Sequence, residues 1–364
     1  MQGGTMRIQR TGTFARPRRA VVGALALGAG LAAAAAAPSG GQDAGVLRAR
    51  AKALFGTLPA LAESPANPSS EARVELGRVL YHDPRLSRSQ EISCNSCHGL
   101  DRYGVDGEPT SAGHKGQRGE RNAPTVYNAA LHVAQFWDGR AKDVEEQAKG
   151  PVTNPVEMAM PSAPDVDRIL RSIPGYAPLF RAAFPGEPDP VSFGRAALAI
   201  AAFERTLVTP APFDAFLAGD DAALSEPQQR GLATFLEVGC PTCHVGPAVG
   251  GAMFQKLGLV HPYATADPGR FAVTRSEADR GVFKVPSLRN VAQTGPWFHD
   301  GRIATLDDAV RKMAWHQLGR ELTAAQTRDV VAFLESLTAP LRPEWTRKPA
   351  LPERGPDTPG PRLD

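Results

Sequence analysis

Two short runs hold the residues best suited to chemistry: Cys94-Asn95-Ser96-Cys97-His98 and Cys240-Pro241-Thr242-Cys243-His244. Both read Cys-x-x-Cys-His, the attachment signature of c-type haem, in which the thiols add to the haem vinyl groups and the histidine ligates iron. The runs use all four cysteines of the chain. Two other interpretations exist. A zinc site would need all four cysteines close together, whereas the two pairs begin 146 residues apart in the sequence. A single run could also be a redox dithiol. The sequence therefore predicts two covalently attached haems, bound through Cys94, Cys97 and His98 and through Cys240, Cys243 and His244.

The second axial ligand of each iron decides between electron transfer and catalysis. The remaining histidines are His82, His114, His132, His261, His299 and His316, and the methionines beyond the N-terminal segment are Met158, Met160, Met253 and Met313. Spacing alone does not choose among them. Met313 is favoured because it shares an apolar helix face with Leu306 and Val310, and a thioether ligand raises the haem potential. An ordinary core methionine is the alternative.

The elements that must position these residues are mainly helical. We expect helices at about 70–81, 164–173 and 193–207, and one that starts at the Ser225/Gln228 capping box and leads into Cys240. Thr305 should begin the Met313 helix, and Thr323 with Gln326 should begin the last one. Gly- and Pro-rich loops separate the helices. Each half thus shows a helix, a cysteine pair, loops and a closing helix, which predicts a mainly α fold with two cytochrome c-like domains, each built around one covalently bound haem.

The N-terminus resembles an export signal. Arg16, Arg18 and Arg19 precede the Ala-rich run at 20–37, which is too short to favour a membrane span, although a retained anchor is the alternative. We expect a cleaved signal peptide at 1–37, an N-terminal haem domain at 38–208, a C-terminal haem domain at 209–340 and a Pro-rich tail at 341–364. Export implies a periplasmic location, with no stable membrane span after signal removal.

The charge balance argues against nucleic acid as a partner. The chain has 41 basic and 38 acidic residues, and five arginines precede the first acidic residue, Asp43. Removal of the signal therefore leaves a small negative charge, without the basic excess typical of nucleic-acid binding.

Long ordered motifs between Val74 and Leu337 make the chain resemble the bacterial di-haem cytochrome c peroxidase family. The matching stretches are LGRVLYHDPRLS, CNSCH, AGHKGQRGERNAPTVYNAA, QFWDGRAKDVEEQAKGPVTNPVEM, CPTCH, VPSLRNVAQTGPWFHDGR and TLDDAVRKMAWHQLG. They cover nearly all of the chain beyond the signal and are far more specific than two haem motifs.

The resemblance implies a role for each matching residue. His98 would be the proximal ligand of the low-potential haem, where peroxide reacts, and His114 its displaceable distal ligand. His244 and Met313 would be the axial pair of the high-potential haem. The other residues that match the family pattern are Glu157 as the catalytic carboxylate, Gln147 and Pro151 in the distal pocket, Trp137 between the haems, and Asn122, Thr294 and Pro296 as ligands of one calcium ion.

The implied reaction is the reduction of hydrogen peroxide to water with electrons from a small cytochrome c or cupredoxin. Homodimers are common in the family. Two other functions stay open: a di-haem enzyme of the methylamine-utilisation type that oxidises residues of a partner protein, and a non-catalytic electron carrier. In the former, a Tyr takes the position matched here by Met313, so Met313 favours the peroxidase. Without the resemblance, Glu157 and His114 would be ordinary loop residues, and Trp137 an ordinary core aromatic.

Overall fold

The computed structural model describes residues 43–363, which contain two hydrophobic cores. The first core takes its buried side chains from residues 76–207 together with Trp345, and the second from residues 47–55 and 213–337. The expected signal peptide at 1–37 lies outside the described residues. Within 43–363, no helix is both long and apolar enough to span a membrane. The structure is mainly helical, as the sequence predicts.

Around the first core, the regular elements are helices and single turns. They are α2 (Glu71–Tyr81), α3 (Cys94–Cys97), α4 (Val144–Gln147), α5 (Gly150–Thr153), α6 (Ala163–Ser172), α7 (Tyr176–Ala183), α8 (Phe193–Glu204), α14 (Pro343–Thr346), η1 (Pro84–Leu86), η2 (Leu100–Arg102), η3 (His114–Gly116) and η4 (Ala129–Leu131).

The second core has helices and one antiparallel ribbon, in which Gln255 of β1 pairs with Phe283 of β2. The elements are α1 (Ala44–Phe55), α9 (Pro212–Ala218), α10 (Glu226–Val238), α11 (Phe271–Thr274), α12 (Leu306–Leu318), α13 (Ala324–Glu335), η5 (Asp221–Ala223), η6 (Cys240–Thr242), η7 (Glu277–Asp279), η8 (Val291–Gln293), β1 (Phe254–Lys256) and β2 (Val282–Lys284).

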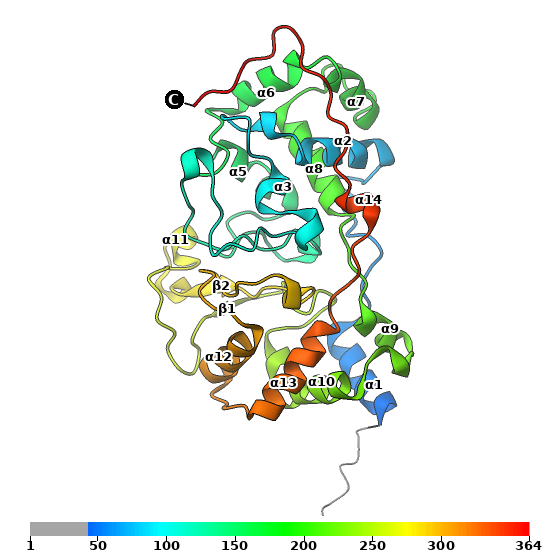
Figure 1. The fold of residues 1–364 in the computed structure, drawn as a ribbon, viewed down its shortest axis with the longest axis vertical. Helices are drawn as coiled ribbons and strands as arrows, with labels where there is room; N and C mark the ends of the chain where they lie inside the picture. Colours follow the sequence, from blue (N-terminus) through cyan, green and yellow to red (C-terminus); the bar gives the residue numbers. More distant parts are fainter. Residues whose placement is uncertain (1–42, 364) are drawn as a thin grey trace, which may run out of the picture. The chain divides into compact units, whose positions relative to one another are not determined.

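A glycine lets two helices cross closely in each core. A Cβ atom on Gly77 of α2 would lie 1.9 Å from the carbonyl oxygen of Ala199 in α8. A Cβ atom on Gly231 of α10 would likewise lie 1.8 Å from the carbonyl oxygen of Asp329 in α13. Figure 1 shows the two crossings, α2 with α8 and α10 with α13. In each core, a glycine thus allows the helix that precedes the cysteine pair, α2 or α10, to pack closely against a later helix, α8 or α13.

The predicted helix starts are confirmed. The Ser70 hydroxyl accepts from Arg73 N at the start of α2, and the Thr305 hydroxyl accepts from Asp308 N at 3.2 Å at the start of α12. Both predicted capping boxes form, at Ser225 with Gln228 and at Thr323 with Gln326. These polar contacts satisfy backbone N–H groups that the first helical turn leaves unpaired, which is why they are readable from sequence.

The two halves repeat at the level of loops as well as helices. Asn128 and Asn290 both adopt left-handed backbone angles, with φ of 62° and 59°. Their side-chain amides both donate to the hydroxyl of Thr209, at 2.7 Å and 3.0 Å. Thr209 is fully buried and lies where the chain passes from one core to the other. The connection is therefore fixed by one hydroxyl shared between the two halves.

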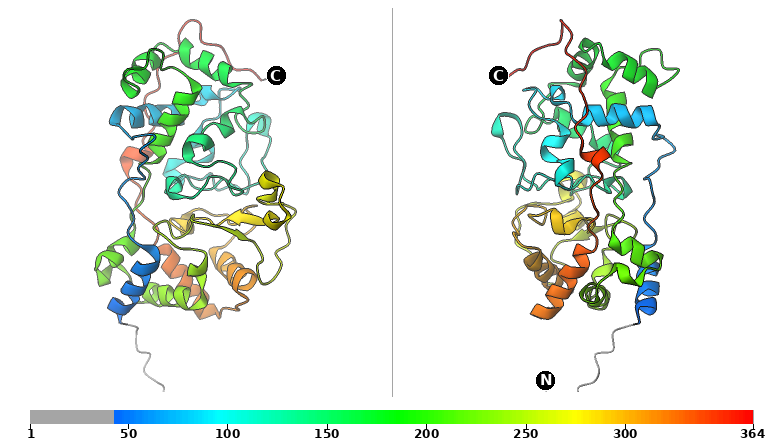
Figure 2. Two further views of the ribbon diagram at one scale, coloured as in Figure 1. Left: turned by 180° about the vertical axis from the view of Figure 1, so that it is seen from behind. Right: turned by 45° about the vertical axis from the view of Figure 1, so that its right-hand side comes forward.

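Three features differ from the sequence-based expectations. Helix α1, expected with the N-terminal domain, packs in the second core through Leu47 and Phe55. The short ribbon of β1 and β2, whose strands have three residues each, lies in a region that was expected to be loop. The Pro-rich tail is irregular beyond α14 but ordered along the first core, where Arg85 Nη1 donates to the carbonyl of Pro352 at 2.7 Å. Figure 2 shows this red segment from two further sides.

Candidate active site

The second Cys-x-x-Cys-His run opens onto a cavity of about 220 Å³. Helix α10 ends at Gly239, whose φ of 104° turns the chain into the Cys240 turn. The wall is largely apolar and includes Phe235, Leu288, Val291, Leu306, Val310 and Leu334. Cys240, Cys243, His244 and Met313 all line the same cavity. An apolar cavity beside two thiols and an imidazole fits a covalently held haem.

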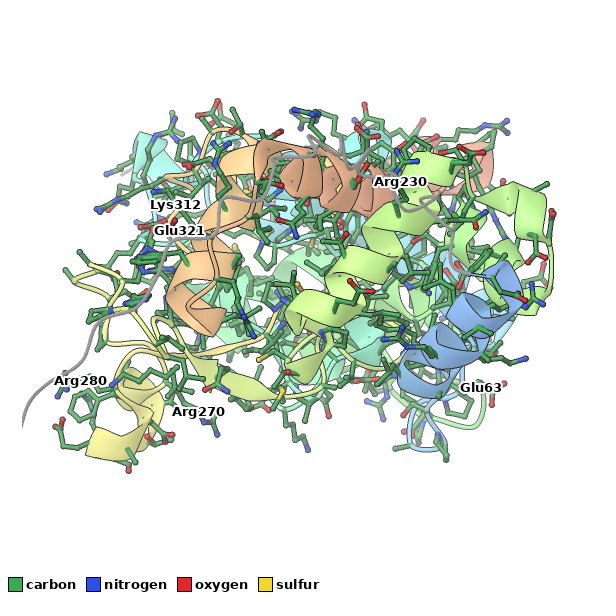
Figure 3. The ribbon with its side chains drawn as sticks, turned by 90° about the horizontal axis from the view of Figure 1, so that it is seen from below. Glu63, Arg230, Arg270, Arg280, Lys312 and Glu321 are labelled. Carbon is green, nitrogen blue, oxygen red and sulfur yellow. The ribbon has the colours of Figure 1, made fainter. Side chains whose placement is uncertain are left out.

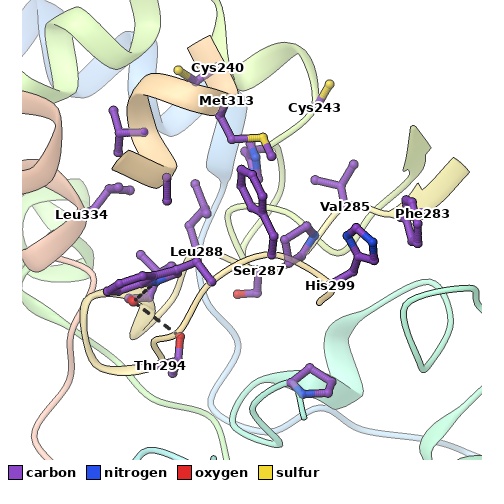
Figure 4. Close-up of a pocket in the computed structure, with 18 of the residues that line it drawn as sticks. Cys240, Cys243, Phe283, Val285, Ser287, Leu288, Thr294, His299, Met313 and Leu334 are labelled. Carbon is purple, nitrogen blue, oxygen red and sulfur yellow. Dashed lines mark hydrogen bonds between the residues drawn. The ribbon is translucent and has the colours of Figure 1, made fainter. Parts of the chain in front are cut away.

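Met313 reaches this cavity from α12, as its helix face predicts. Its thioether points into the cavity on the side where Cys240 and Cys243 lie (Figure 4). Its neighbour Ala314 is buried and lines the same cavity. The structure therefore brings the predicted axial pair, His244 and Met313, into one cavity.

His244 has the properties of a neutral imidazole available for ligation. Burial lowers its pKa to about 4. Its backbone N–H donates to the carbonyl of Cys240 at 3.1 Å, and its buried Nδ1 has no hydrogen-bond partner. Gly250 lies against the ring, because a Cβ atom there would be 3.1 Å from Nδ1. An imidazole must be neutral to bind a metal, and burial of this one favours its neutral form.

The first run forms the short helix α3, with Ser93 and Ser96 as its capping box. Tyr81 of α2 donates its hydroxyl to the carbonyl of His98 at 2.7 Å. The Nδ1 atom of His98 lies 3.3 Å from the carbonyl oxygen of Gly104, which leaves Nε2 free to act as a ligand. Burial lowers the pKa of His98. The first motif is thus also arranged for haem.

The four cysteines form no disulfide with one another, and burial raises the pKa of Cys94 and of Cys240 to about 12. Redox dithiols have lowered thiol pKa values, so this environment argues against that interpretation. Within the described part of the chain, no three His, Cys, Asp or Glu side chains lie close enough together to hold a metal ion.

His114 and Glu157 lie side by side. The N–H of His114 donates to the carbonyls of Val156 and Glu157, at 3.1 Å and 2.8 Å. Gly113 permits this approach, since a Cβ atom there would be 2.0 Å from the carbonyl oxygen of Val156. His114 is buried, and its Nδ1 has no partner. Lys115 and Gly116 have positive φ, so the loop leaves the site by a sharp turn.

The Glu157 carboxyl is half-buried and oriented by Asn154, whose Nδ2 donates to Oε1 at 2.8 Å. Burial raises the pKa of Glu157, while the positive charge of Arg140 acts in the opposite direction. The Glu157 carboxylate also acts on the Cys97 thiol. Burial raises the pKa of Cys97, and the negative charges of Asp106 and Glu157 raise it further. A carboxylate with a raised pKa near the first motif is suited to proton transfer.

Gln147 and Pro151 have fewer contacts with His114 and Glu157. Pro151 lies in α5, and its carbonyl accepts from Met158 N at 3.1 Å, which links it to the Glu157 turn. Gln147 is the last residue of α4, and no side-chain hydrogen bond joins it to His114 or Glu157 in the described structure. The expected place of Gln147 in a distal pocket stays a prediction.

Trp137 lines the cavity of the second motif although it belongs to the first half of the chain. Its Nε1 donates to the carbonyl of Asn122 at 2.9 Å, and its own carbonyl accepts from Lys284 N at 2.7 Å. Its ring meets His299 edge to face, with centroids 6.4 Å apart. Trp137 therefore contacts residues of both halves.

Arginines bind the two halves together beside Trp137. Arg121 forms ion pairs with Asp138 at 2.6 Å and with Asp267 at 2.7 Å. Arg270, labelled in Figure 3, donates to the carbonyl of Asp138 at 2.9 Å. These contacts are charge-assisted and partly buried, and they fix the first half against the cavity of the second.

The expected calcium ligands Asn122, Thr294 and Pro296 all line the same cavity. The backbone oxygen of Asn122 already accepts from Trp137. The three residues supply neutral oxygens and no carboxylate, whereas calcium takes six to eight oxygen ligands. Water would have to complete the shell.

The comparisons with known proteins agree with this arrangement. Residues 71–222 match the family model described as di-haem cytochrome c peroxidase. The chain is 49% identical over 323 residues to a cytochrome c551 peroxidase of Pseudomonas aeruginosa, covering 86% of this chain and 93% of the relative. It is 46% identical over 319 residues to the Nitrosomonas europaea protein of the same name, covering 86% and 94%.

Among solved structures, a MauG-like protein associated with microbial copper homeostasis aligns with a TM-score of 0.73 at 28% identity, covering 81% of this chain and 98% of that one. The relatives named as peroxidases are thus more similar in sequence than this MauG-like structure. With the paired Cys-x-x-Cys-His sites in place, these similarities show that the chain belongs to the di-haem cytochrome c peroxidase family.

Proposed function

We propose that the chain reduces hydrogen peroxide to water, H2O2 + 2 e⁻ + 2 H⁺ → 2 H2O, in two cytochrome c-like domains that each hold one covalently attached haem. Cys94 and Cys97 hold one haem and Cys240 and Cys243 the other, with His98 and His244 as proximal ligands. When bound, the haems supply the redox chemistry that cleaves the O–O bond. The observation that carries the proposal is the side-by-side placement of His114 and Glu157 near the first motif, apart from the cavity that contains Met313.

Glu157 has the proton-transfer role in this proposal. Cleavage of the O–O bond needs a proton moved from one peroxide oxygen to the other. The hydrogen bond from Asn154 orients the carboxylate while leaving its second oxygen for this transfer. The raised pKa brings the group nearer to the pH at which it can both accept and return a proton.

His114 has the gating role. Its buried Nδ1 is unpartnered, and it lies in the single 3-10 turn η3, where Lys115 and Gly116 have positive φ, so that a movement of this loop would break only that one turn. We expect His114 to block the peroxide site until the other haem is reduced. His114→Gly should therefore bind peroxide without prior reduction, as seen in optical titrations of the oxidised protein. If the variant still depends on reduction, the gate is not His114.

One experiment separates this proposal from its two alternatives. Spectra of the half-reduced protein are recorded with and without peroxide, followed by a donor-oxidation assay. The peroxidase should show a high-spin signal that peroxide removes, and then oxidise its donor. Two haems that stay six-coordinate indicate an electron carrier, and peroxide binding without donor oxidation indicates an enzyme that acts on a partner protein.

The proposal also covers the location of the protein, its electron donor, its oligomeric state and its calcium ion. We expect a periplasmic protein, exported through a cleaved signal at 1–37, that receives electrons from a small cytochrome c or cupredoxin and forms a homodimer. We also expect one calcium ion at Asn122, Thr294 and Pro296. Elemental analysis of purified protein before and after chelation tests the calcium site, and a metal-free preparation of full activity would remove it.

A further inference from the structure

Lys284 is a buried cation that the proposed reaction does not use. It is the last residue of β2, between Phe283 and Val285, and its side chain is 6% exposed. Lysines are almost never buried to this extent unless they are paired with an anion. Its burial therefore needs an explanation.

Among the described residues, no carboxylate pairs with the Lys284 ammonium. The Lys284 ammonium has one hydrogen-bond partner, Nδ1 of His132 at 3.2 Å, and no ion pair with a carboxylate. Burial lowers the pKa of Lys284 to about 8, and burial together with the Lys284 charge holds the pKa of His132 well below its usual value. His132 is therefore neutral and accepts from the ammonium through Nδ1. Its buried Nε2 has no partner.

Both side chains line the cavity that contains Cys240, His244 and Met313. Among the described residues of that lining, Lys284 is the one side chain charged at neutral pH, and none is Asp or Glu. Holding an ammonium in an apolar cavity without a counter-charge is unfavourable, because the group loses its hydration. The cavity is thus complementary to a ligand that has an acidic group of its own.

We propose that Lys284, with His132 behind it, binds a carboxylate of the haem that occupies this cavity. The inference rests on the proposed function, which places a haem there. The haem propionates are the acidic groups that enter with it, and one of them supplies the missing anion. A fixed positive charge also favours the reduced iron over the oxidised iron, so Lys284 should raise the potential of this haem and help to make it the electron-accepting one.

The test replaces Lys284 with Gln, Met or Arg in the full haem-loaded protein. The midpoint potential of the C-terminal haem is measured by spectroelectrochemical titration, and its propionate vibrations by resonance Raman spectroscopy. Lys284→Gln and Lys284→Met should lower the potential and shift the propionate bands, while Lys284→Arg keeps both near the wild-type values. Lys256→Gln is the matched control, because Lys256 ends the neighbouring strand β1 and is exposed.

Haem content separates failure of the inference from failure of the proposed function. Two haems per chain with an unchanged potential and unchanged propionate bands in Lys284→Gln would overturn the inference alone. A single haem in the wild-type protein would overturn the proposed function. If Lys284→Met does not fold, Lys284→Gln still decides, since its amide keeps a donor for Nδ1 of His132.

Discussion

The Glu157 carboxylate is oriented but not neutralised by its neighbours, which suits a group that must take up and release a proton. Its one side-chain hydrogen bond comes from Asn154, and no ion pair involves it in the described structure. We expect Glu157→Gln to reduce turnover with peroxide by about 10²–10⁴-fold, since the amide cannot carry the proton. Steady-state kinetics and the spectra of both haems measure the outcome. Glu120→Gln is the control, because Glu120 is exposed and lies in the loop that follows His114. Unchanged turnover would remove Glu157 from the reaction.

Glu204 makes the stability of the protein depend on pH. Burial, and then the charge of Glu145, raise the pKa of Glu204 from 4.5 to about 8. Arg205, next in the chain, binds Glu145 with two 2.9 Å hydrogen bonds. The folded state therefore keeps a proton that the unfolded state loses above pH 4.5, so this group's contribution to stability is full below that pH and is lost as pH rises towards 8.

Glu204→Gln should remove this loss. The variant should gain stability over the wild type between pH 5 and pH 8, by on the order of a few kcal/mol at the upper end. Urea unfolding at both pH values measures the difference, with the exposed Glu321→Gln as control. An equal difference at both pH values would show that Glu204 ionises normally.

At the level of elements, the helix crossings depend on glycine. Gly231→Ala places a methyl group 1.8 Å from the carbonyl oxygen of Asp329, so α10 and α13 must separate. We expect a loss of about 1–3 kcal/mol in unfolding free energy, with weakened packing around Phe235 and Phe333. Denaturant unfolding of the variant measures the loss.

Gly194→Ala provides the matched control, because it lies in α8 with no atom within 4 Å of an added Cβ. The intrinsic preference of helices for Ala over Gly should make it neutral or slightly stabilising. If both substitutions had the same effect, helix propensity and not the crossing would explain Gly231.

For the whole molecule, Thr209 connects the halves. Its hydroxyl accepts from the amides of Asn128 and Asn290, and all three residues are buried. Thr209→Val keeps the shape but removes the acceptor, so each amide left unpaired should cost about 1–3 kcal/mol. Thermal unfolding followed at both haem bands measures the loss, and we expect both bands to change at the same lowered temperature. Thr57→Val, at an exposed site, should leave it unchanged. Loss of only one band would show that the two cores unfold independently.

The parts of the fold predicted from sequence are those set by local contacts. The helix starts at Ser70, Ser225, Thr305 and Thr323 depend on a side chain and a backbone N–H a few residues apart, so sequence pattern identifies them. The ribbon of β1 and β2 was missed because its strands have three residues each, too few for a detectable alternation, and lie in a region rich in Gly and Pro. Helix α1 was not predicted, and its packing in the second core depends on tertiary contacts that no sequence pattern shows.

The sequence by itself determined the two Cys-x-x-Cys-His sites, the apolar helix face of Met313 and, through long ordered motifs, the family. Only the tertiary structure placed His114 against Glu157, brought Trp137 to the second cavity, and buried Lys284 with His132 there. The physical reason is distance along the chain. Haem attachment and helix capping use neighbours within a few residues. The contacts of His114 with Glu157, of Trp137 with Lys284 and of His132 with Lys284 join residues 43, 147 and 152 apart, which meet only after folding.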